Sequence, residues 1–226
     1  MQIYGIKNGL NLLYHLLYTN LIHKLNQQIS IFKYKSPIGD ILLGAFENKI
    51  CLCDWEYRKM RLSIDQRIQS NIGGKYHYQN EAIIEMAITQ LEEYFVRKRT
   101  QFSIPILFAG TEFQQRVWSE LRTIEYGQTI SYLELANRLN SKLAIRAIAA
   151  ANGANALSIL VPCHRIIGSD GSLIGYAGGL SAKKKLLELE STSTQGVLFD
   201  YQWMANFPIV DLFSNIACAS ANWSTE

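Results

Sequence analysis

The sequence predicts an α+β protein, with a small N-terminal domain built on an antiparallel sheet and a mainly α-helical domain after it. Residues 30–57 read as short strands separated by turns, residues 80–99 as one long amphipathic helix, and the chain after residue 110 as several short helices. The 226 residues are 48% hydrophobic and 18% charged, which is typical of a globular chain. The predicted parts are a helical extension (1–29), an α+β domain (30–104), a helical domain (105–195) and a C-terminal extension (196–226).

Leucines at spacings of three and four predict that residues 1–29 are helical. The longest apolar runs, 10–22 and 207–219, are interrupted by polar residues and fall short of the roughly 18 residues of a membrane span. The N-terminus also lacks the cationic and apolar segments of a signal peptide. We therefore expect a cytoplasmic protein with no membrane partner and with reduced thiols.

The N-terminal domain is predicted to contain an antiparallel meander. Residues 41–46 and 50–55 are apolar runs separated by three polar residues, and a Ser-Pro-Ile-Gly turn precedes the first of them. Cys51 and Cys53 fall in the second run. Two thiols without a nearby His or Cys do not make a zinc site, so we expect small core residues and no bound metal.

A longer helix is predicted to open at Asn80-Glu81 and to end near the basic residues 97–99, whose charge suits a helix C-terminus. Residues 100–110 contain a proline and form the best candidate for a linker between the two domains.

The helical domain begins with Thr111 as a helix cap. Ser131 and Glu134 are spaced as a capping box, in which each side chain satisfies the other's backbone amide, and they open a second helix. A third, alanine-rich helix spans residues 144–151 after a short polar turn. The last two helices have helix-turn-helix proportions, although an alanine-rich helix can equally be an ordinary packed helix.

Basic residues outnumber acidic ones between positions 142 and 185. Asp170 is the single acidic residue there, and the basic ones are Lys142, Arg146, Arg165, Lys183, Lys184 and Lys185. Such an excess is typical of a surface that binds a polyanion. The alternative is a solvated face that carries helix-end lysines.

A short apolar run ends at Pro162-Cys163-His164-Arg165. Nearby positive charge or a general base increases the thiolate fraction of a cysteine, so this cluster suggests a nucleophile. Adjacent side chains on an extended chain point apart, so His164 would reach Cys163 through a water molecule. The alternative is that Cys163 is a small buried hydrophobe and His164 a turn residue.

Five segments between residues 110 and 190 together carry a family resemblance. They are Gly110–Trp118, Tyr126–Tyr132, Ala144–Ala147, Val161–Arg165 and Gly175–Leu180, followed by a helix to Glu190. In this order and spacing they resemble the O6-alkylguanine-DNA alkyltransferases, also called methylated-DNA–protein-cysteine methyltransferases. Residues 30–100 resemble that family only loosely. The resemblance implies a winged-helix-like helix-turn-helix domain that carries an active-site cysteine.

The resemblance implies DNA repair by direct reversal. Cys163 would accept an alkyl group from O6 of guanine, and from O4 of thymine, irreversibly and once per protein molecule. His164 would act as a base through water, Glu190 would orient and charge-stabilise His164, and Tyr132 would donate toward the guanine ring. The implied partner is double-stranded DNA that contains O6-alkylguanine, bound by a monomer without cofactors, in the cytoplasm and at the nucleoid if the source is bacterial.

The remaining site residues implied by the resemblance form two groups. The DNA-binding group is Arg146, Ala144, Ala147 and Ser131, with Arg146 filling the gap left by a flipped nucleotide. The substrate-pocket group is Asn155, Ile166, Tyr176 and Ala177, with Asn155 tying the recognition helix to the active-site segment.

The chain departs from the family pattern beside the pocket. Ala156 and Ser158 stand where proline is common, and Ile174 stands where a small or polar residue is usual, so the accepted adduct size is in question. One alternative function is a non-catalytic protein that binds alkyl lesions on the same scaffold, although such relatives lack the cysteine. A Cys-His hydrolase is a second alternative, for which the sequence shows no oxyanion hole.

Overall fold

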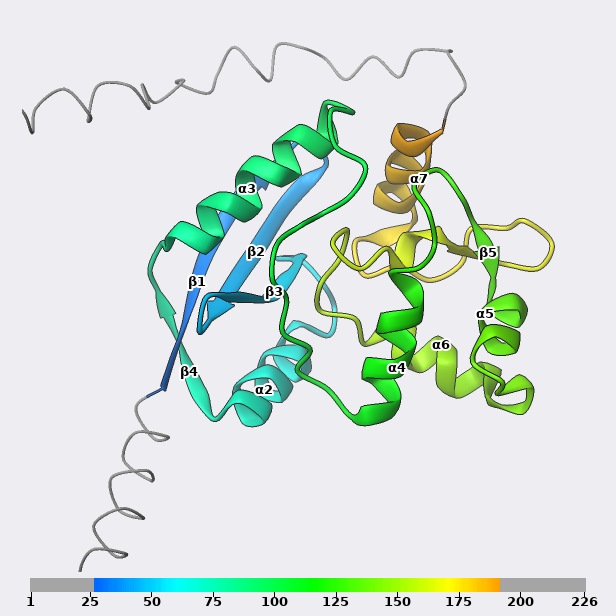
Figure 1. The fold of residues 1–226 in the computed structure, drawn as a ribbon, viewed down its shortest axis with the longest axis horizontal. Helices are drawn as coiled ribbons and strands as arrows, with labels where there is room; N and C mark the ends of the chain where they lie inside the picture. The colour runs from blue at the N-terminus through cyan, green and yellow to red at the C-terminus, as the bar shows by residue number, and fades with distance from the viewer. Residues whose placement is uncertain (1–26, 192–226) are drawn as a thin grey trace, which may run out of the picture. The chain divides into compact units, whose positions relative to one another are not determined.

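The computed structural model describes residues 27–191, which form the α+β fold that the sequence predicts (Figure 1). Most of the predicted N-terminal helical extension and the C-terminal extension lie outside these residues. The prediction of helix for residues 27–29 is wrong, because the first strand begins at Gln27. Among the described residues, no helix is long and apolar enough to span a membrane.

The N-terminal half is built on a four-stranded sheet with the order β3-β2-β1-β4. Its strands are β1 (Gln27–Ser36), β2 (Gly39–Phe46), β3 (Lys49–Trp55) and β4 (Gly74–Tyr78). The first three pair antiparallel, as the meander predicts, but β4 pairs parallel with β1. The sheet is therefore mixed rather than purely antiparallel, since helix α2 (Arg61–Ile72) makes the crossover between β3 and β4.

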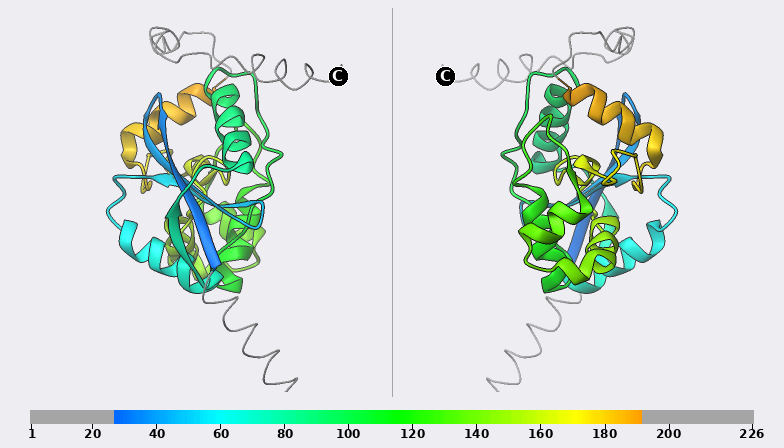
Figure 2. Two further views of the ribbon diagram at one scale, coloured as in Figure 1. Left: turned by 90° about the vertical axis from the view of Figure 1, so that its left-hand side faces the viewer. Right: turned by 90° about the vertical axis from the view of Figure 1, so that its right-hand side faces the viewer.

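Two helices cover opposite faces of this sheet (Figure 2). Ile29 and Ile31 of β1 pack in one buried cluster with Ile64 and Ile68 of α2. Ser30, which lies between them and points the other way, donates to the carboxylate of Glu81 at the start of helix α3 (Ala82–Phe95). Both faces of β1 are consequently buried.

The segment predicted to be a linker is fastened to the edge of the sheet. The amide of Ile50 donates to the carbonyl of Pro105, and the amide of Leu107 donates to the carbonyl of Ile50, each at 2.9 Å. These bonds anchor the chain between the sheet and the helices that follow.

The C-terminal half is mainly helical (Figure 1). Its elements are α4 (Glu112–Leu121), β5 (Ile130–Ser131), α5 (Tyr132–Arg138), η1 (Lys142–Ala144), α6 (Ile145–Gly153), η2 (Cys163–Arg165), β6 (Ile166–Ile167) and α7 (Gly179–Glu190). Helices α4, α5 and α6 contact one another, and the two short strands pair parallel. The indole of Trp118 on α4 donates to the carbonyl of Ala151 on α6 (2.8 Å), which fixes the alanine-rich helix.

The helix caps differ in part from the prediction. Thr111 and Gln114 form a complete capping box at α4. Ser131 accepts a hydrogen bond from the amide of Glu134, but the Glu134 carboxylate accepts from Arg138 (2.7 Å) instead of from the Ser131 amide. The reciprocal half of the predicted capping box is therefore wrong, because an i,i+4 ion pair takes the carboxylate.

Candidate functional site

Cys163 begins the short helix η2, and its position is fixed by the loop before it. The Asn155 side chain donates to the carbonyl of Val161 (3.0 Å) and accepts from the amide of Leu157 (2.9 Å). The amide of Cys163 in turn donates to the Val161 carbonyl (2.8 Å). Asn155 thus joins the end of α6 to the segment that carries the thiol, which is the place that the resemblance implied for it.

The buried carboxylate of Glu190 collects four neighbours at the end of α7. It pairs with Nε2 of His164 (2.8 Å) and with Nε and Nη2 of Arg165 (2.8 and 2.9 Å). The Tyr94 hydroxyl donates to it (2.7 Å), and so does the amide of Gly127 (3.2 Å). The sequence pointed to the His164–Glu190 pair, but it gave no signal that Arg165 and Tyr94 would share the carboxylate.

This cluster fixes the protonation of His164. Burial works to raise the pKa of Glu190, but hydrogen bonds from His164 and Arg165 hold it well below its usual value. Burial lowers the pKa of His164, so its ring is neutral near pH 7. Nε2 then donates to Glu190, and Nδ1 carries a lone pair. Nδ1 is buried and has no hydrogen-bond partner among the described residues.

The resting thiol of Cys163 is protonated. The residue is only 3% exposed, and burial raises the pKa of its thiol above the usual value. The hydrogen bond with Asn155 opposes this effect only in part. Arg165 follows the thiol closely in sequence, but its guanidinium is bound to Glu190 and to the carbonyl of Ile124. Nucleophilic attack by Cys163 consequently requires a base.

Burial raises the pKa of the Tyr132 hydroxyl, and Tyr132 lies close enough to Cys163 that a negative charge on the sulfur would raise this pKa further. Its hydroxyl oxygen accepts a hydrogen bond from Asn152 of α6 (3.2 Å), so its own proton stays available to another acceptor. Gly175 lies opposite, with the Tyr132 hydroxyl 3.9 Å from the position that a Cβ at Gly175 would take.

The predicted pocket residues surround the same place. The Tyr176 ring stands edge-on to Trp55 (6.0 Å between centroids) and to His164 (6.3 Å). Ile166 is fully buried directly after η2, and Ala177 is partly exposed. The structure thus brings Tyr176 and Ile166 together with the predicted catalytic residues.

A lysine that sequence reasoning placed on a basic surface is buried instead. Lys183 of α7 donates to the carbonyls of Ile166 and Ile174 (2.7 Å for the latter), and burial lowers its pKa to about 8. Arg165 is also buried. The predicted basic face therefore loses two of its charges, and Lys183 joins the active-site segment to the loop that carries Tyr176.

Replacing Lys183 by methionine is expected to lower the free energy of unfolding by about 2 kcal/mol, because the buried carbonyl of Ile166 and the partly buried carbonyl of Ile174 lose their donor. Urea unfolding measures this change. Lys184→Met is the matched control, since Lys184 is 68% exposed and its substitution should change stability by less than about 0.5 kcal/mol. Equal stability of the two variants would contradict this role of Lys183.

Arginines of the N-terminal half cap the end of α6. Arg58 donates to the carbonyl of Asn155 (2.7 Å) and to Asp54 (2.6 Å), and Arg67 donates to the carbonyl of Ala154 (2.8 Å). Cations are favourable at a helix C-terminus. Ser158, where the family pattern has proline, donates to Asp54 (3.1 Å). The contacts between the two halves join residues 87 to 104 positions apart, so the local sequence pattern does not show them.

The predicted DNA-binding residues lie at the surface of the helix-turn-helix. Arg146 and Ala147 are exposed on α6, Ala144 is partly exposed just before it, and Ser131 caps α5. Ile148, on the same helix, is buried in the protein core. The structure therefore separates this exposed set from the buried set around Cys163.

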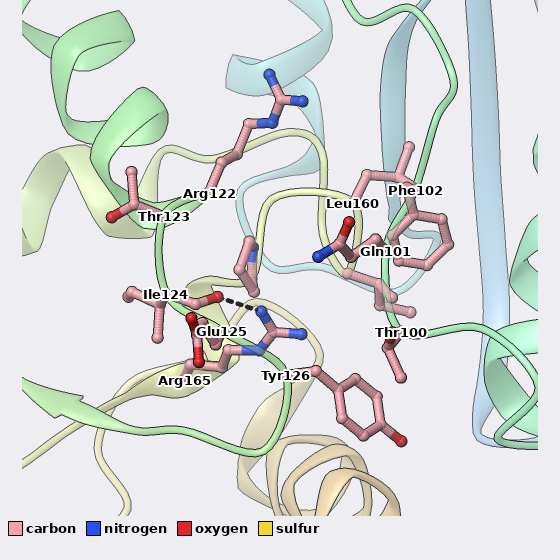
Figure 3. Close-up of a pocket in the computed structure, with 12 residues that line it drawn as sticks. Thr100, Gln101, Phe102, Arg122, Thr123, Ile124, Glu125, Tyr126, Leu160 and Arg165 are labelled. Atoms are coloured by element: carbon pink, nitrogen blue, oxygen red, sulfur yellow. Dashed lines mark hydrogen bonds between the residues drawn. The ribbon is translucent and has the colours of Figure 1, made fainter.

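A cavity of about 630 Å³ lies behind the active-site segment (Figure 3). Pro162 and Arg165 reach it, but Cys163 is not among its lining residues. Nη1 of Arg165 donates there to the carbonyl of Ile124 (2.5 Å), as the dashed line in Figure 3 shows. This space is separate from the surroundings of the thiol.

Comparisons with known proteins agree with this arrangement. Residues 31–108 match the family model described as 6-O-methylguanine DNA methyltransferase, ribonuclease-like domain, and residues 112–192 match the one described as 6-O-methylguanine DNA methyltransferase, DNA binding domain. A methylated-DNA–protein-cysteine methyltransferase of Mycobacterium leprae is 42% identical over 170 residues, which cover 73% of this chain and 95% of that protein. One from Methanosarcina acetivorans is 37% identical over 159 residues, covering 70% and 96%. The crystal structure of Mycobacterium tuberculosis OGT in complex with DNA aligns with a TM-score of 0.60 at 36% identity, covering 72% of this chain and 92% of that one.

Proposed function

The chain belongs to the methylated-DNA–protein-cysteine methyltransferase family and repairs DNA by alkyl transfer to cysteine, and from this premise we propose that Cys163 is the acceptor. The substrate is O6-alkylguanine in double-stranded DNA, with O4-alkylthymine as a second substrate. The observation that carries the proposal is that Cys163 and His164 are buried next to each other in sequence and that His164 is bound to Glu190 through Nε2. This leaves Nδ1 of the neutral His164 ring able to accept the thiol proton.

Transfer begins with the loss of the thiol proton. A water molecule passes this proton from Sγ of Cys163 to Nδ1 of His164, and the adjacent carboxylate of Glu190 stabilises the imidazolium that forms. Sγ then attacks the alkyl carbon, forming the S–C bond as the C–O6 bond breaks. The electron pair of that bond stays with guanine, which becomes an anion that the Tyr132 hydroxyl stabilises by a hydrogen bond. The proton held by His164 then returns through water to this anion, so that guanine leaves neutral.

The base leaves the helix before it reacts, because a stacked guanine cannot reach a buried sulfur. Arg146 fills the space left in the duplex, while Ser131, Ala144 and Ala147 contact the backbone beside it. The extruded base enters between Tyr132 and the loop of Tyr176, where Asn155, Ile166 and Ala177 complete the pocket. Since Cys163 is almost fully buried, the base has to enter deep between these segments to reach Sγ.

We propose a monomer as the acting form, as the resemblance implies, because the transfer step uses one thiol and one His164–Glu190 pair. We propose that the protein consists of a domain at 30–104 and a DNA-binding, alkyl-accepting domain at 105–195, with extensions at 1–29 and 196–226. The chemistry proposed for Cys163 requires no cofactor, because both the nucleophile and the base are side chains.

An Arg146→Ala variant is expected to repair alkylated duplex about tenfold more slowly or worse, since filling the gap offsets part of the few kcal/mol that extrusion costs. Its reaction with free O6-benzylguanine should be unchanged, because no base has to be extruded. Single-turnover rates with the two substrates measure the difference.

The matched control for this experiment is Lys49→Ala, which removes one exposed positive charge from the first residue of β3. It should react like the parent protein with both substrates. Equal losses of Arg146→Ala with duplex and with the free base would overturn the extrusion role.

A further inference from the structure

Two apolar side chains are exposed where α6 begins. Leu143 in η1 is 105% exposed, more than any other large apolar side chain in residues 27–191, and Ile145 is 36% exposed. Single exposed apolar side chains are common on protein surfaces, but these two flank the start of the helix that carries Arg146, so they are placed to contact whatever this helix binds.

These residues lie on the outward side of the helix that carries Arg146. Arg146 and Ala147 are exposed, whereas Ile148 is buried against α4 and α5. Leu143 lies in η1, directly before α6, and its side chain is exposed, as are those of Ile145, Arg146 and Ala147 in the first turn of α6. The short side chain of Ala147 lets this face approach a surface closely.

The surroundings of Leu143 are polar in a way that suits a nucleic acid. A shallow hollow beside it is lined by Asn137, Asn140 and Ser141. Amide and hydroxyl groups of this kind bind phosphate and sugar oxygens, and they fix the position of a protein on a duplex. Leu143 therefore lies between polar side chains that can bind the DNA backbone and Arg146. Apolar side chains in such positions can insert between base steps from the minor groove.

We propose that Leu143 and Ile145 form an apolar wedge that enters the minor groove next to Arg146 and packs against the bases unstacked by extrusion. This inference rests on the proposed function, because it takes α6 as the helix that meets the damaged duplex. Arg146 fills the vacated position, and the wedge stabilises the opened step beside it. The wedge therefore acts on the duplex and not on the chemistry at Cys163.

The test compares Leu143→Ala with the parent protein on alkylated duplex and on free O6-benzylguanine. The variant should repair the duplex about tenfold more slowly, since unstacking a base step is costly without a wedge, and should react with the free base at the parent rate. Ile145→Ala should show a smaller loss of the same kind. Leu62→Ala is the control, since Leu62 of α2 is 79% exposed and lies outside the proposed DNA-binding face.

Salt dependence separates the wedge from a charge effect. Leu143 neutralises no phosphate, so Leu143→Ala should weaken duplex binding without changing the slope of log K against log salt concentration. Arg146→Ala should reduce that slope by about one unit. A changed slope for Leu143→Ala would overturn the wedge.

The remaining outcomes are distinct. Repair of duplex by Leu143→Ala at the parent rate, or an equal loss with duplex and free base, overturns the wedge while the proposed function stands. A DNA-free oligomer that dissociates in Leu143→Ala assigns this face to a second copy of the chain and also overturns the wedge. Absence of transfer by the parent protein contradicts the proposed function itself.

Discussion

A Cys163→Ser variant is expected to take up no alkyl group from methylated duplex DNA, whereas the parent protein should reach a plateau of one group per molecule. A serine hydroxyl at this position remains protonated near neutral pH, and His164 alone does not make it a nucleophile comparable to a thiolate. Transfer of labelled methyl groups from duplex to protein, followed until it stops, measures both values.

The control for this variant is Cys51→Ala. Cys51 is another buried thiol, but it lies in the cluster between β1 and α2, away from His164. Its removal should leave the plateau at one group per molecule. Uptake by Cys163→Ser, or more than one transfer per parent molecule, would contradict the assignment of Cys163 as a single-use acceptor.

A Glu190→Gln variant is expected to lose both stability and activity. Glutamine keeps the size of the side chain but leaves the buried guanidinium of Arg165 without a counter-charge, which should cost about 3–5 kcal/mol of the free energy of unfolding. The His164 imidazolium also loses its stabilising charge, so transfer should slow by about 100-fold. Urea unfolding gives the first value, and single-turnover rates corrected for the folded fraction give the second.

Glu188→Gln provides the comparison for Glu190. Glu188 lies on the same helix, has a side chain that is 42% exposed, and forms a surface ion pair with Lys184 (3.7 Å), so its substitution should change stability by less than about 0.5 kcal/mol. Similar stabilities and rates for the two variants would show that the buried cluster around Glu190 does not support His164.

The stability difference between the parent and Glu190→Gln should depend on pH. The pKa of Glu190 in the folded state is below its unfolded value of about 4.3, so the carboxylate contributes its full stability above that pH and loses it as the pH falls toward the folded pKa. The two unfolding curves should therefore converge in acid. A difference that grows as the pH falls below about 4 would contradict the depressed pKa.

Local patterns in the sequence predict much of the fold. The turn residues between apolar runs predict the meander, and Thr111 and Ser131 are the N-cap residues of α4 and α5, as the sequence predicts. Helix α2 and strand β4 were not predicted, because α2 buries only Ile64 and Ile68 and therefore shows a weak amphipathic pattern. The place of β4 in the sheet depends on its pairing with β1, for example Gln27 with Gly74, which are far apart in sequence.

The site was predicted less completely, for a physical reason. Cys163 and His164 are neighbours in sequence, and the resemblance supplied Glu190. No local rule shows that Arg165 turns away from the thiol to share Glu190, or that Lys183 is buried beneath the pocket loop. Burial and pairing of charges depend on tertiary packing, which is why the sequence does not show that Lys183 and Arg165 are absent from the basic face.

Mass spectrometry of the parent protein after incubation with methylated duplex tests the central claim most directly. Digestion should yield one modified peptide, heavier by a single methyl group, and fragmentation should place that group on Sγ of Cys163. The same digest of Cys163→Ser should carry no added mass. A methyl group on any other residue, or complete demethylation of the DNA with no mass gained by the protein, would contradict alkyl transfer to Cys163.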